Sequence, residues 1–331
     1  MLNLMSSLFR RLSQKLAACG ALGVTFLLLG CQTALVTTAN STGAPDEIIQ
    51  PILILASPVS DVVMESSPVG PGDALAKLRR GFKLEYADNH RTEAEKKWFV
   101  RHPDYMTRVL TRAQRYLPYI VAELERRDMP LELALLPIVE SAYDPFAYSH
   151  GRAAGLWQMI PGTAKRFGIK QNWWYDGRRD VIDSTRAALD YLEYLYKFNN
   201  GDWLNAIASY NSGEGNVRRA IRRNNSANKP IDFWSLKLPK ETSMYVPKLL
   251  ALVEIVADPA KYNLTLPVVV DVPQFKVANI GGQLDLALAA ELAGVDVDTV
   301  YQYNPGYNRW STDPSGPHNL VMPIDVADEF I

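Results

Sequence analysis

Residues 131–159 constrain the fold of this chain more than any other stretch. The apolar side chains between 131 and 139 recur at helical spacing, which predicts a core helix that ends before Pro145. An acid, Glu140, follows this apolar run directly. Burial beside such a run disfavours the charged form of a carboxyl group and raises its pKa, as in a general acid. We therefore predict a helical core built around Glu140 as a catalytic acid.

Short motifs after this acid strengthen the prediction, because a lone glutamate at a helix end is more often solvated. In chain order they are Glu140-Ser141, Gly155-Leu156-Trp157-Gln158-Met159, Ser209-Tyr210-Asn211-Ser212-Gly213, and Glu241-Thr242 with Tyr245. In order and rough spacing they resemble the motifs of the soluble lytic transglycosylase family. The resemblance implies a mainly α protein with a lysozyme-like helical catalytic domain that cleaves bacterial peptidoglycan.

The resemblance also implies roles for the matching residues. Glu140 is the catalytic acid, and the tyrosine at the position of Tyr210 holds it through the ring hydroxyl. The residues expected to contact bound glycan are Ser141, Gln158, Met159, Tyr210, Asn211, Glu241 and Tyr245. Ser141 either lies near the Glu140 carboxyl or caps the helix end. The tryptophans at 157, 173 and 174 either stack on sugar rings or pack in the core.

The family reaction needs one carboxyl group. The acid protonates the leaving oxygen of the β-1,4 bond between MurNAc and GlcNAc, and then serves as the base towards the C6 hydroxyl of the same muramoyl sugar. This intramolecular attack forms 1,6-anhydromuramoyl ends, and a correctly oriented internal nucleophile reacts far faster than water.

Two alternatives stay open at this point. A muramidase would hydrolyse the same bond with water and would need a second carboxylate, for which Asp144, Glu214 and Glu241 are the candidates. A wall-binding lipoprotein without catalytic activity is the other alternative. The presence of Glu140 together with Gln158 and Tyr210 argues against it.

Composition excludes several classes of partner. The 331 residues leave room for about two domains. The net charge of −1 provides no broad cationic field, so we expect no nucleic-acid partner, and the arginines at 218, 219, 222 and 223 are expected to form a solvated helix face. The four histidines lack ligand spacing. We therefore expect no metal and no cofactor; the oligomeric state stays open.

The N-terminus predicts export and lipid anchoring. Basic residues precede the apolar run 21–29 in residues 1–30, as in a signal peptide. Leu28-Leu29-Gly30-Cys31 resembles the lipoprotein cleavage box, so Cys31 becomes the lipidated first residue. By resemblance, Gln32 favours the periplasmic face of the outer membrane. An ordinary cleaved signal peptide or an uncleaved anchor is the alternative, and Cys19 is a weaker lipidation site because no apolar run precedes it.

Three segments are expected after the signal peptide: a tether at 31–72, the helical catalytic domain at 73–264, and a small α+β module at 265–331. The predicted order in the module is a strand at 268–270, helices at 283–293 and 297–304, and a strand at 320–322. This order resembles a LysM module. Gly281-Gly282-Gln283-Leu284 departs from the usual entry motif, so glycan binding and a packing role are both open.

Overall fold

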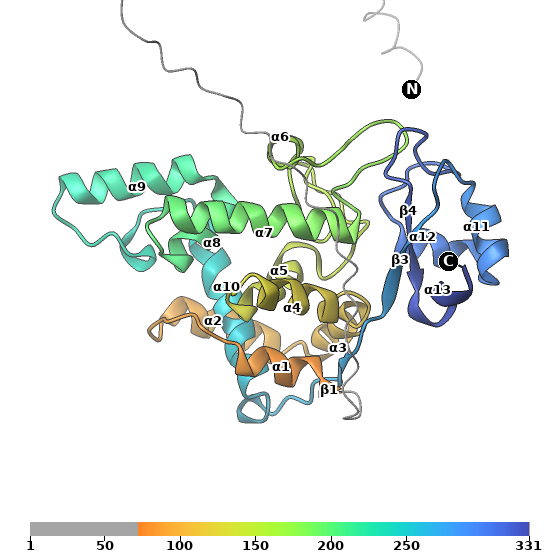
Figure 1. Ribbon diagram of the computed structural model, residues 1–331. Helices are drawn as coiled ribbons and strands as arrows, with labels where there is room; N and C mark the ends of the chain where they lie inside the picture. Colours follow the sequence, from red (N-terminus) through yellow and green to blue (C-terminus); the bar gives the residue numbers. More distant parts are fainter. Residues whose placement is uncertain (1–71, 331) are drawn as a thin grey trace, which may run out of the picture. The chain divides into compact units, whose positions relative to one another are not determined.

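Helices dominate the part of the protein that the computed structural model describes, residues 72–330 (Figure 1). These residues lie within one compact unit, Ser66–Ile331. The predicted signal peptide, the lipidation site Cys31 and the tether lie outside the described residues, apart from the last residue of the tether, Gly72.

Helices and 3-10 turns make up most of the region up to residue 262. They are α1 (Ala74–Arg80), α2 (His90–Val100), α3 (Pro103–Ala113), α4 (Leu117–Arg126), η1 (Leu131–Leu135), α5 (Leu136–Ser141), α6 (Pro161–Arg166), α7 (Val181–Phe198), α8 (Trp203–Ser212), α9 (Glu214–Ser226), η2 (Phe233–Ser235), α10 (Lys240–Ala257) and η3 (Ala260–Tyr262). The mainly helical fold predicted from the sequence is confirmed.

The predicted core helix at 131–139 is two elements. Residues 131–135 form the 3-10 turn η1, and α5 follows with Pro137 in its first turn. Proline has no amide hydrogen to donate, so it suits the first turn of a new helix better than the interior of a long one. Of the apolar positions at helical spacing, Leu131, Leu135 and Ile138 are buried as predicted, whereas Val139 is only partly buried.

Capping residues in the sequence predict helix starts at Thr92, after 183–185 and at Asp202. The first helix begins two residues before Thr92, at His90, because the side chain of Asn89 accepts a hydrogen bond from the amide of Arg91. The second begins at Val181, because Asp180 accepts from the amides of Ile182 and Asp183. The cap at Asp202 is confirmed at the start of α8.

Helix α10 carries the fourth motif and contains a proline in its interior, Pro247. Proline cannot donate to the carbonyl four residues earlier, which is that of Ser243. The guanidinium group of Arg91 on α2 donates to this carbonyl at 3.2 Å. The freed acceptor is therefore satisfied from the neighbouring helix, and α10 packs along α2 and α8 (Figure 1).

The C-terminal region is a small α+β module, as predicted. Strand β3 (Phe275–Asn279) pairs antiparallel with β4 (Asn319–Pro323), with Val277 opposite Val321. Between them lie α11 (Leu286–Ala293) and α12 (Val297–Tyr303), and α13 (Ile324–Phe330) follows β4. The buried amide of Asn304 joins α12 to β4, because it donates to the carbonyl of Val321 and accepts from its amide at 2.8 Å each.

The prediction that residues 268–270 form the first strand of the C-terminal module was wrong. Residues 270 and 271 form β2 (Val270–Asp271), which pairs with β1 (Gly72–Asp73) at the start of the catalytic region. The amide of Ala74 also donates to the carbonyl of Val269 at 2.7 Å. A run of valines favours extended backbone but does not specify the partner strand. The final helix α13 was not predicted.

Candidate active site

A groove of about 1000 Å³ lies where the four motifs meet. Its walls come from the end of α5, the loop between α5 and α6, the junction of α8 and α9, and the first half of α10. The residues of the motifs that line it are Glu140, Gln158, Met159, Tyr210, Asn211, Ser212, Gly213, Glu241 and Tyr245. Ser141, the remaining predicted site residue, does not line it.

Glu140 is half-buried at the last turn of α5 and faces this groove. Burial raises the pKa of its carboxyl group to about 7. A hydrogen bond from the Tyr245 hydroxyl to Oε1 lowers this pKa, the charge of Glu241 raises it, and Lys248 lowers it. A carboxyl group with a pKa near neutrality holds a proton that it can donate at physiological pH.

The chain turns sharply after Glu140. Ala142 and Tyr143 both adopt left-handed backbone conformations, with φ of 52° and 57°. The buried hydroxyl of Tyr143 donates to the carbonyl of Ala134 at 2.6 Å, which fixes this turn against η1. The left-handed turn therefore ends α5 at Ser141, four residues before Pro145, and Glu140 stays on the last helical turn.

The loop 147–159 forms the wall opposite α10 and depends on a glycine. Gly155 has a φ of +79°, and a Cβ atom there would lie 1.9 Å from the carbonyl oxygen of Arg178. The buried guanidinium of Arg178 donates to the carbonyls of Arg152 and Met159, and it pairs with Asp176. This clamp was not predicted, because nothing local marks Arg178 as a partner of the loop.

The second motif, residues 155–159, forms part of the groove wall and leaves few side-chain polar groups available to a ligand. The amide nitrogen of Gln158 donates to the carbonyls of Ala147 and Gly155, so only its side-chain oxygen is left for a ligand. Met159 lies in the wall with 3% of its surface exposed. Trp157 is fully buried and donates to Thr185 at 3.0 Å. Of the two alternatives for this tryptophan, packing in the core is the one observed.

Of its two predicted positions, Ser141 takes the one at the helix end, because it is the last residue of α5 and its hydroxyl bonds a carbonyl of the same helix. Its hydroxyl contacts the carbonyl of Pro137 at 3.2 Å and that of Leu156 at 2.9 Å. It therefore ties α5 to the second motif and does not contact the carboxyl group of Glu140.

The tyrosine that holds the acid is not the expected one. The hydroxyl of Tyr210 donates to the carbonyl of Trp157 at 2.7 Å, whereas the hydroxyl of Tyr245 donates to Glu140. Both tyrosines lie beside the acid, since its charge contributes to the raised pKa of each ring hydroxyl. Tyr210 thus positions the second motif, and Tyr245 contacts the acid directly.

Asn211 connects the third motif to the fourth. Its side-chain oxygen accepts from the hydroxyl of Thr242 at 2.8 Å, and its nitrogen donates to Glu241 at 3.1 Å. Because both of its polar atoms are engaged on α10, Asn211 fixes the position of this helix against α8. The carboxyl group of Glu241 is thereby held at the groove.

Three further carboxylates line the groove with Glu140, namely Glu95, Glu214 and Glu241. Glu214 accepts from Arg166 and Tyr191, and burial raises the pKa of Glu95. Of the three, only Glu241 contributes to the pKa of Glu140. Asp144 does not line the groove, and its side chain accepts from the amide of Phe146.

Sequence analysis missed three charged residues of the groove, Glu95 on α2 and both Lys240 and Lys248 on α10. Lys248 follows Tyr245 by three residues and Met244 by four, so all three share one helix face. Extending the fourth motif along the helix would have found Lys248. No such signal marks Glu95, because its position depends on how α2 packs against α10.

Within residues 72–330, no group of three or more histidine, cysteine or acidic side chains is arranged to hold a metal ion. Over the same residues, none of the helices combines the length and the apolar character needed to cross a bilayer.

Two parts of the chain match known protein families. Residues 118–233 match the family described as transglycosylase SLT domain, which covers η1, α5 and the first three motifs. The chain contains an SLT domain. Residues 274–331 match the LysM-like domain of lytic transglycosylase MltD, which begins one residue before β3. The SLT domain thus contains Glu140, and the fourth motif on α10 lies beyond its matched boundary.

Two curated relatives are similar to this chain. The membrane-bound lytic murein transglycosylase D of Escherichia coli (strain K12) is 40% identical over 259 residues, which are 78% of this chain and 57% of that protein. The chain thus spans a little over half the length of this relative. A protein of Alteromonas sp. (strain M-1) named for tributyltin chloride resistance is 51% identical over 136 residues, 40% of this chain and 66% of that protein.

Among solved structures, the 70 kDa soluble lytic transglycosylase of Escherichia coli overlaps 49% of this chain and 29% of its own, with 20% identity and a TM-score of 0.37. A TM-score this low does not define a common fold.

Proposed function

We propose that this protein is a peptidoglycan lytic transglycosylase, a carbon-oxygen lyase in which Glu140 is the single acid and base. One observation carries the proposal: Glu140 has a pKa near 7 and lies in a large groove with the hydroxyl of Tyr245 on its carboxyl group. The SLT domain match, and a relative named as a murein transglycosylase, support peptidoglycan as the substrate.

In the proposed reaction the protonated Glu140 donates its proton to the oxygen that leaves the muramoyl C1 atom. The bond between C1 and this oxygen breaks, and positive charge develops at the sugar ring. The resulting Glu140 carboxylate then accepts the proton of the C6 hydroxyl on the same sugar, and O6 bonds to C1. Glu140 donates one proton and accepts one in return, so it ends the reaction in its starting form, and no water is consumed.

The environment of Glu140 suits both steps. Burial favours the protonated acid before cleavage. After proton transfer, the hydrogen bond from Tyr245 and the charge of Lys248 stabilise the carboxylate. Gln158 presents its side-chain oxygen, Met159 an apolar wall, and Asn211 holds α10 in register. Ser141 and Tyr210 act as positioning residues, because their hydroxyls bind main-chain carbonyls.

Hydrolysis by water is the second candidate, and the observation that favours it is Glu241. Its carboxylate lines the groove and acts electrostatically on Glu140. A hydrolase would use such a second carboxylate to activate water or stabilise the sugar cation. Glu241 accepts from Asn211, which suits a residue that binds sugar hydroxyls through its other oxygen.

The proposal includes the placement of the enzyme. Cys31 carries the lipid that holds the protein at the periplasmic face of the outer membrane, and 31–72 spans the distance to the wall. The relative named as membrane-bound supports attachment to a membrane. It also includes a catalytic domain at 73–264 and a LysM-like module at 265–331, which is supported by one family match within each segment, at 118–233 and 274–331.

Product mass analysis tests the reaction. The full chain is incubated with purified sacculi, and released muropeptides are analysed by mass spectrometry. We expect anhydro ends, which are one water lighter than hydrolysed ends. Glu140→Gln should reduce release by at least about a thousandfold, because proton transfer is lost. Asp144→Asn is the matched control, since this acid lies outside the groove and its variant should retain activity.

The outcomes separate the candidates. Hydrolysed ends that disappear with Glu241→Gln would establish the muramidase. Undiminished release by Glu140→Gln would remove Glu140 from the mechanism. Binding of sacculi without release by the unmodified protein would leave a wall-binding protein.

A further inference from the structure

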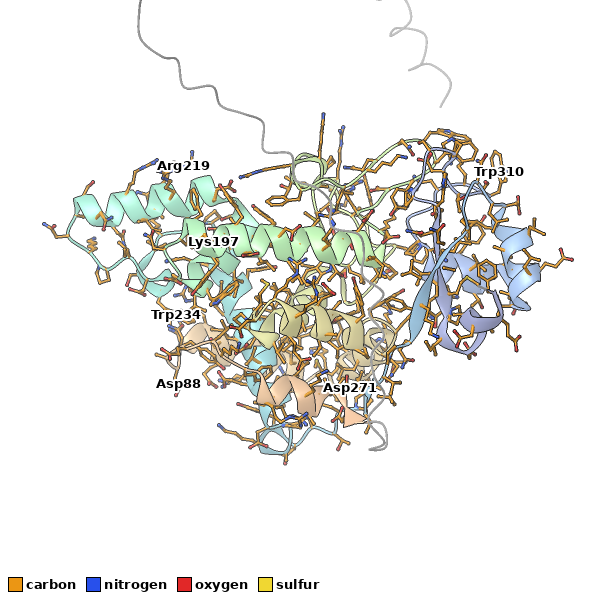
Figure 2. All side chains as sticks on the ribbon, in the orientation of Figure 1. Asp88, Lys197, Arg219, Trp234, Asp271 and Trp310 are labelled. Atoms are coloured by element: carbon orange, nitrogen blue, oxygen red, sulfur yellow. The ribbon has the colours of Figure 1, made fainter. Side chains whose placement is uncertain are left out.

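Three tryptophans, Trp173, Trp174 and Trp310, gather outside the catalytic groove. Trp173 and Trp174 lie in the loop between α6 and α7, and Trp310 lies in the loop between α12 and β4. The ring centroids of Trp173 and Trp310 are 6.0 Å apart, and those of Trp174 and Trp310 are 5.7 Å apart. Figure 2 shows Trp310 where the loop before α7 reaches the C-terminal module. We call these three residues the tryptophan cluster.

The cluster exposes aromatic surface. Trp173 is 54% exposed and Trp310 is 58% exposed. Their rings meet at 85°, an edge arrangement that covers less indole surface than a parallel stack would, and the guanidinium of Arg309 lies against one face of Trp173. Exposed apolar surface of this kind commonly marks a ligand or partner site.

The cluster is held by a buried polar clamp. Asp313 is 1% exposed and accepts from Asn172 at 2.5 Å and Lys170 at 2.8 Å. The side-chain oxygen of Asn172 in turn accepts from the amides of Trp174 and Tyr175. The carbonyl of Trp174 accepts from the amide of Asn308 at 2.8 Å. The loops of the cluster are therefore fixed before any ligand binds, which lowers the entropic cost of binding.

A continuous set of contacts leads from the catalytic groove to the cluster. Ser149 and Ala153 line the groove, and their neighbour Tyr148 is 57% exposed. The guanidinium of Arg179 lies 6.0 Å from the centre of the Tyr148 ring and donates to Asn308. The next residue, Arg309, lies 4.0 Å from the centre of the Trp173 ring.

We propose that the tryptophan cluster is a second glycan-binding site, which holds the polysaccharide strand after it passes from the catalytic groove over Tyr148. This inference rests on the proposed function, because it takes the same polymer as the ligand. Pyranose rings present flat faces of C–H groups that stack on indole, and the exposed rings of Trp173 and Trp310 offer such surfaces. The site joins the catalytic region to the C-terminal module.

A membrane surface is the competing occupant, since tryptophan and arginine also gather at lipid interfaces. Attraction to an anionic leaflet needs several basic side chains directed at the lipid. The two guanidinium groups next to the cluster, those of Arg179 and Arg309, are instead engaged over Tyr148 and Trp173. The contacts that lead to the catalytic groove further favour a glycan.

Binding to insoluble peptidoglycan tests the site directly. The full chain carrying Glu140→Gln, which does not cleave, is titrated against sacculi with and without Trp173→Ala or Trp310→Ala. We expect each tryptophan change to weaken binding about tenfold, as the loss of one aromatic stacking contact does. Trp98→Ala on α2 is the matched control and should bind like the parent. Thermal unfolding of each variant verifies that the fold is kept.

Kinetics on two substrate lengths complete the test. With active chain, Trp173→Ala and Trp310→Ala should raise KM about tenfold for long glycan strands, leave kcat unchanged, and leave both constants unchanged for a tetrasaccharide. Equal effects on both substrates, or no effect on either, would overturn the inference. So would variants that lose binding to phosphatidylglycerol vesicles but retain binding to sacculi. If the proposed function is wrong, the unmodified chain will release no anhydro products. This result is distinct from the results that would overturn the second glycan-binding site.

Discussion

At the scale of single residues, the chemistry depends on how one carboxyl group keeps its proton. Burial raises the pKa of Glu140 to about 7, while Tyr245 and Lys248 oppose this rise. In the proposed reaction the acid is thus protonated before cleavage, and Tyr245 and Lys248 stabilise its charged form afterwards. No second carboxylate is needed for this balance, although Glu241 adds to the raised pKa.

The pH dependence of the reaction should follow this acid. Only the protonated form donates a proton, so kcat/KM should fall as pH rises through about 7. The hydrogen bond from Tyr245 lowers the pKa of Glu140, so Tyr245→Phe should move this fall to higher pH. It should also reduce the rate at pH 6 about tenfold, because the carboxyl group is less well oriented. A pH profile of product release measures both effects.

Tyr210→Phe is the matched control for this experiment. Its hydroxyl donates to the carbonyl of Trp157, so the pH at which activity falls should not change. Stability should drop by about 1–2 kcal/mol, because a carbonyl loses its donor. The same shift in both variants would show that the Tyr245 contact does not set the pKa of Glu140.

At the scale of elements, the groove exists because the loop 147–159 lies tightly against the segment before α7. Gly155 permits this approach, and Arg178 fastens the loop through two carbonyls. On the opposite side, Asn211 fixes α10, while Arg91 satisfies the carbonyl that Pro247 leaves free. Both walls are thus held by side chains from elsewhere in the chain.

Gly155→Ala should destabilise the protein by about 3 kcal/mol or more. The added methyl group would meet the carbonyl of Arg178, and a φ of +79° is strained for alanine. Gly215→Ala, near the start of α9, is the control, because a Cβ there meets no atom within 4 Å. The control should gain up to about 1 kcal/mol from helix propensity. Denaturant unfolding measures the free energy of unfolding of both variants. Equal values would show that the carbonyl of Arg178 does not lie this close to Gly155.

At the scale of the whole described region, the catalytic region and the C-terminal module are joined by polar contacts. Burial alone would raise the pKa of Asp313, but hydrogen bonds from Lys170, Asn172 and Ser315 outweigh it and hold the pKa well below its ordinary value. Because the pKa of Asp313 is lower in the folded protein than in the unfolded chain, the charged side chain stabilises the fold fully at pH values above about 4. This stabilisation is lost as the pH falls below about 4.

Asp313→Asn should therefore cost about 1–3 kcal/mol at pH 7, because Lys170 loses its partner in a largely buried pair. The difference between variant and parent should shrink as pH falls below about 4. Glu291→Gln on the exposed face of α11 is the control and should change stability by less than about 0.5 kcal/mol. Unfolding curves between pH 3 and 7 measure this. A cost that does not vary with pH would contradict the role of the charge.

The sequence by itself determined which residues form helices and which acid lies at the end of the buried one. Helical periodicity, caps such as Asp202 and the apolar run before Glu140 are local, so they are visible without coordinates. The predicted starts of the helices that begin at His90 and Val181 were wrong by a few residues. Near each start, more than one polar side chain is able to cap the helix.

Only the tertiary structure decided which side chains meet. Tyr245 lies 105 residues from Glu140 and contacts it, while Tyr210 contacts Trp157 instead. Val270 and Asp271 pair with Asp73 and Gly72 at the start of the helical region, and β3 takes the predicted place of residues 268–270 in the module. Hydrogen-bond and strand partners depend on the packing of distant elements, whereas local sequence spacing encodes only the elements themselves.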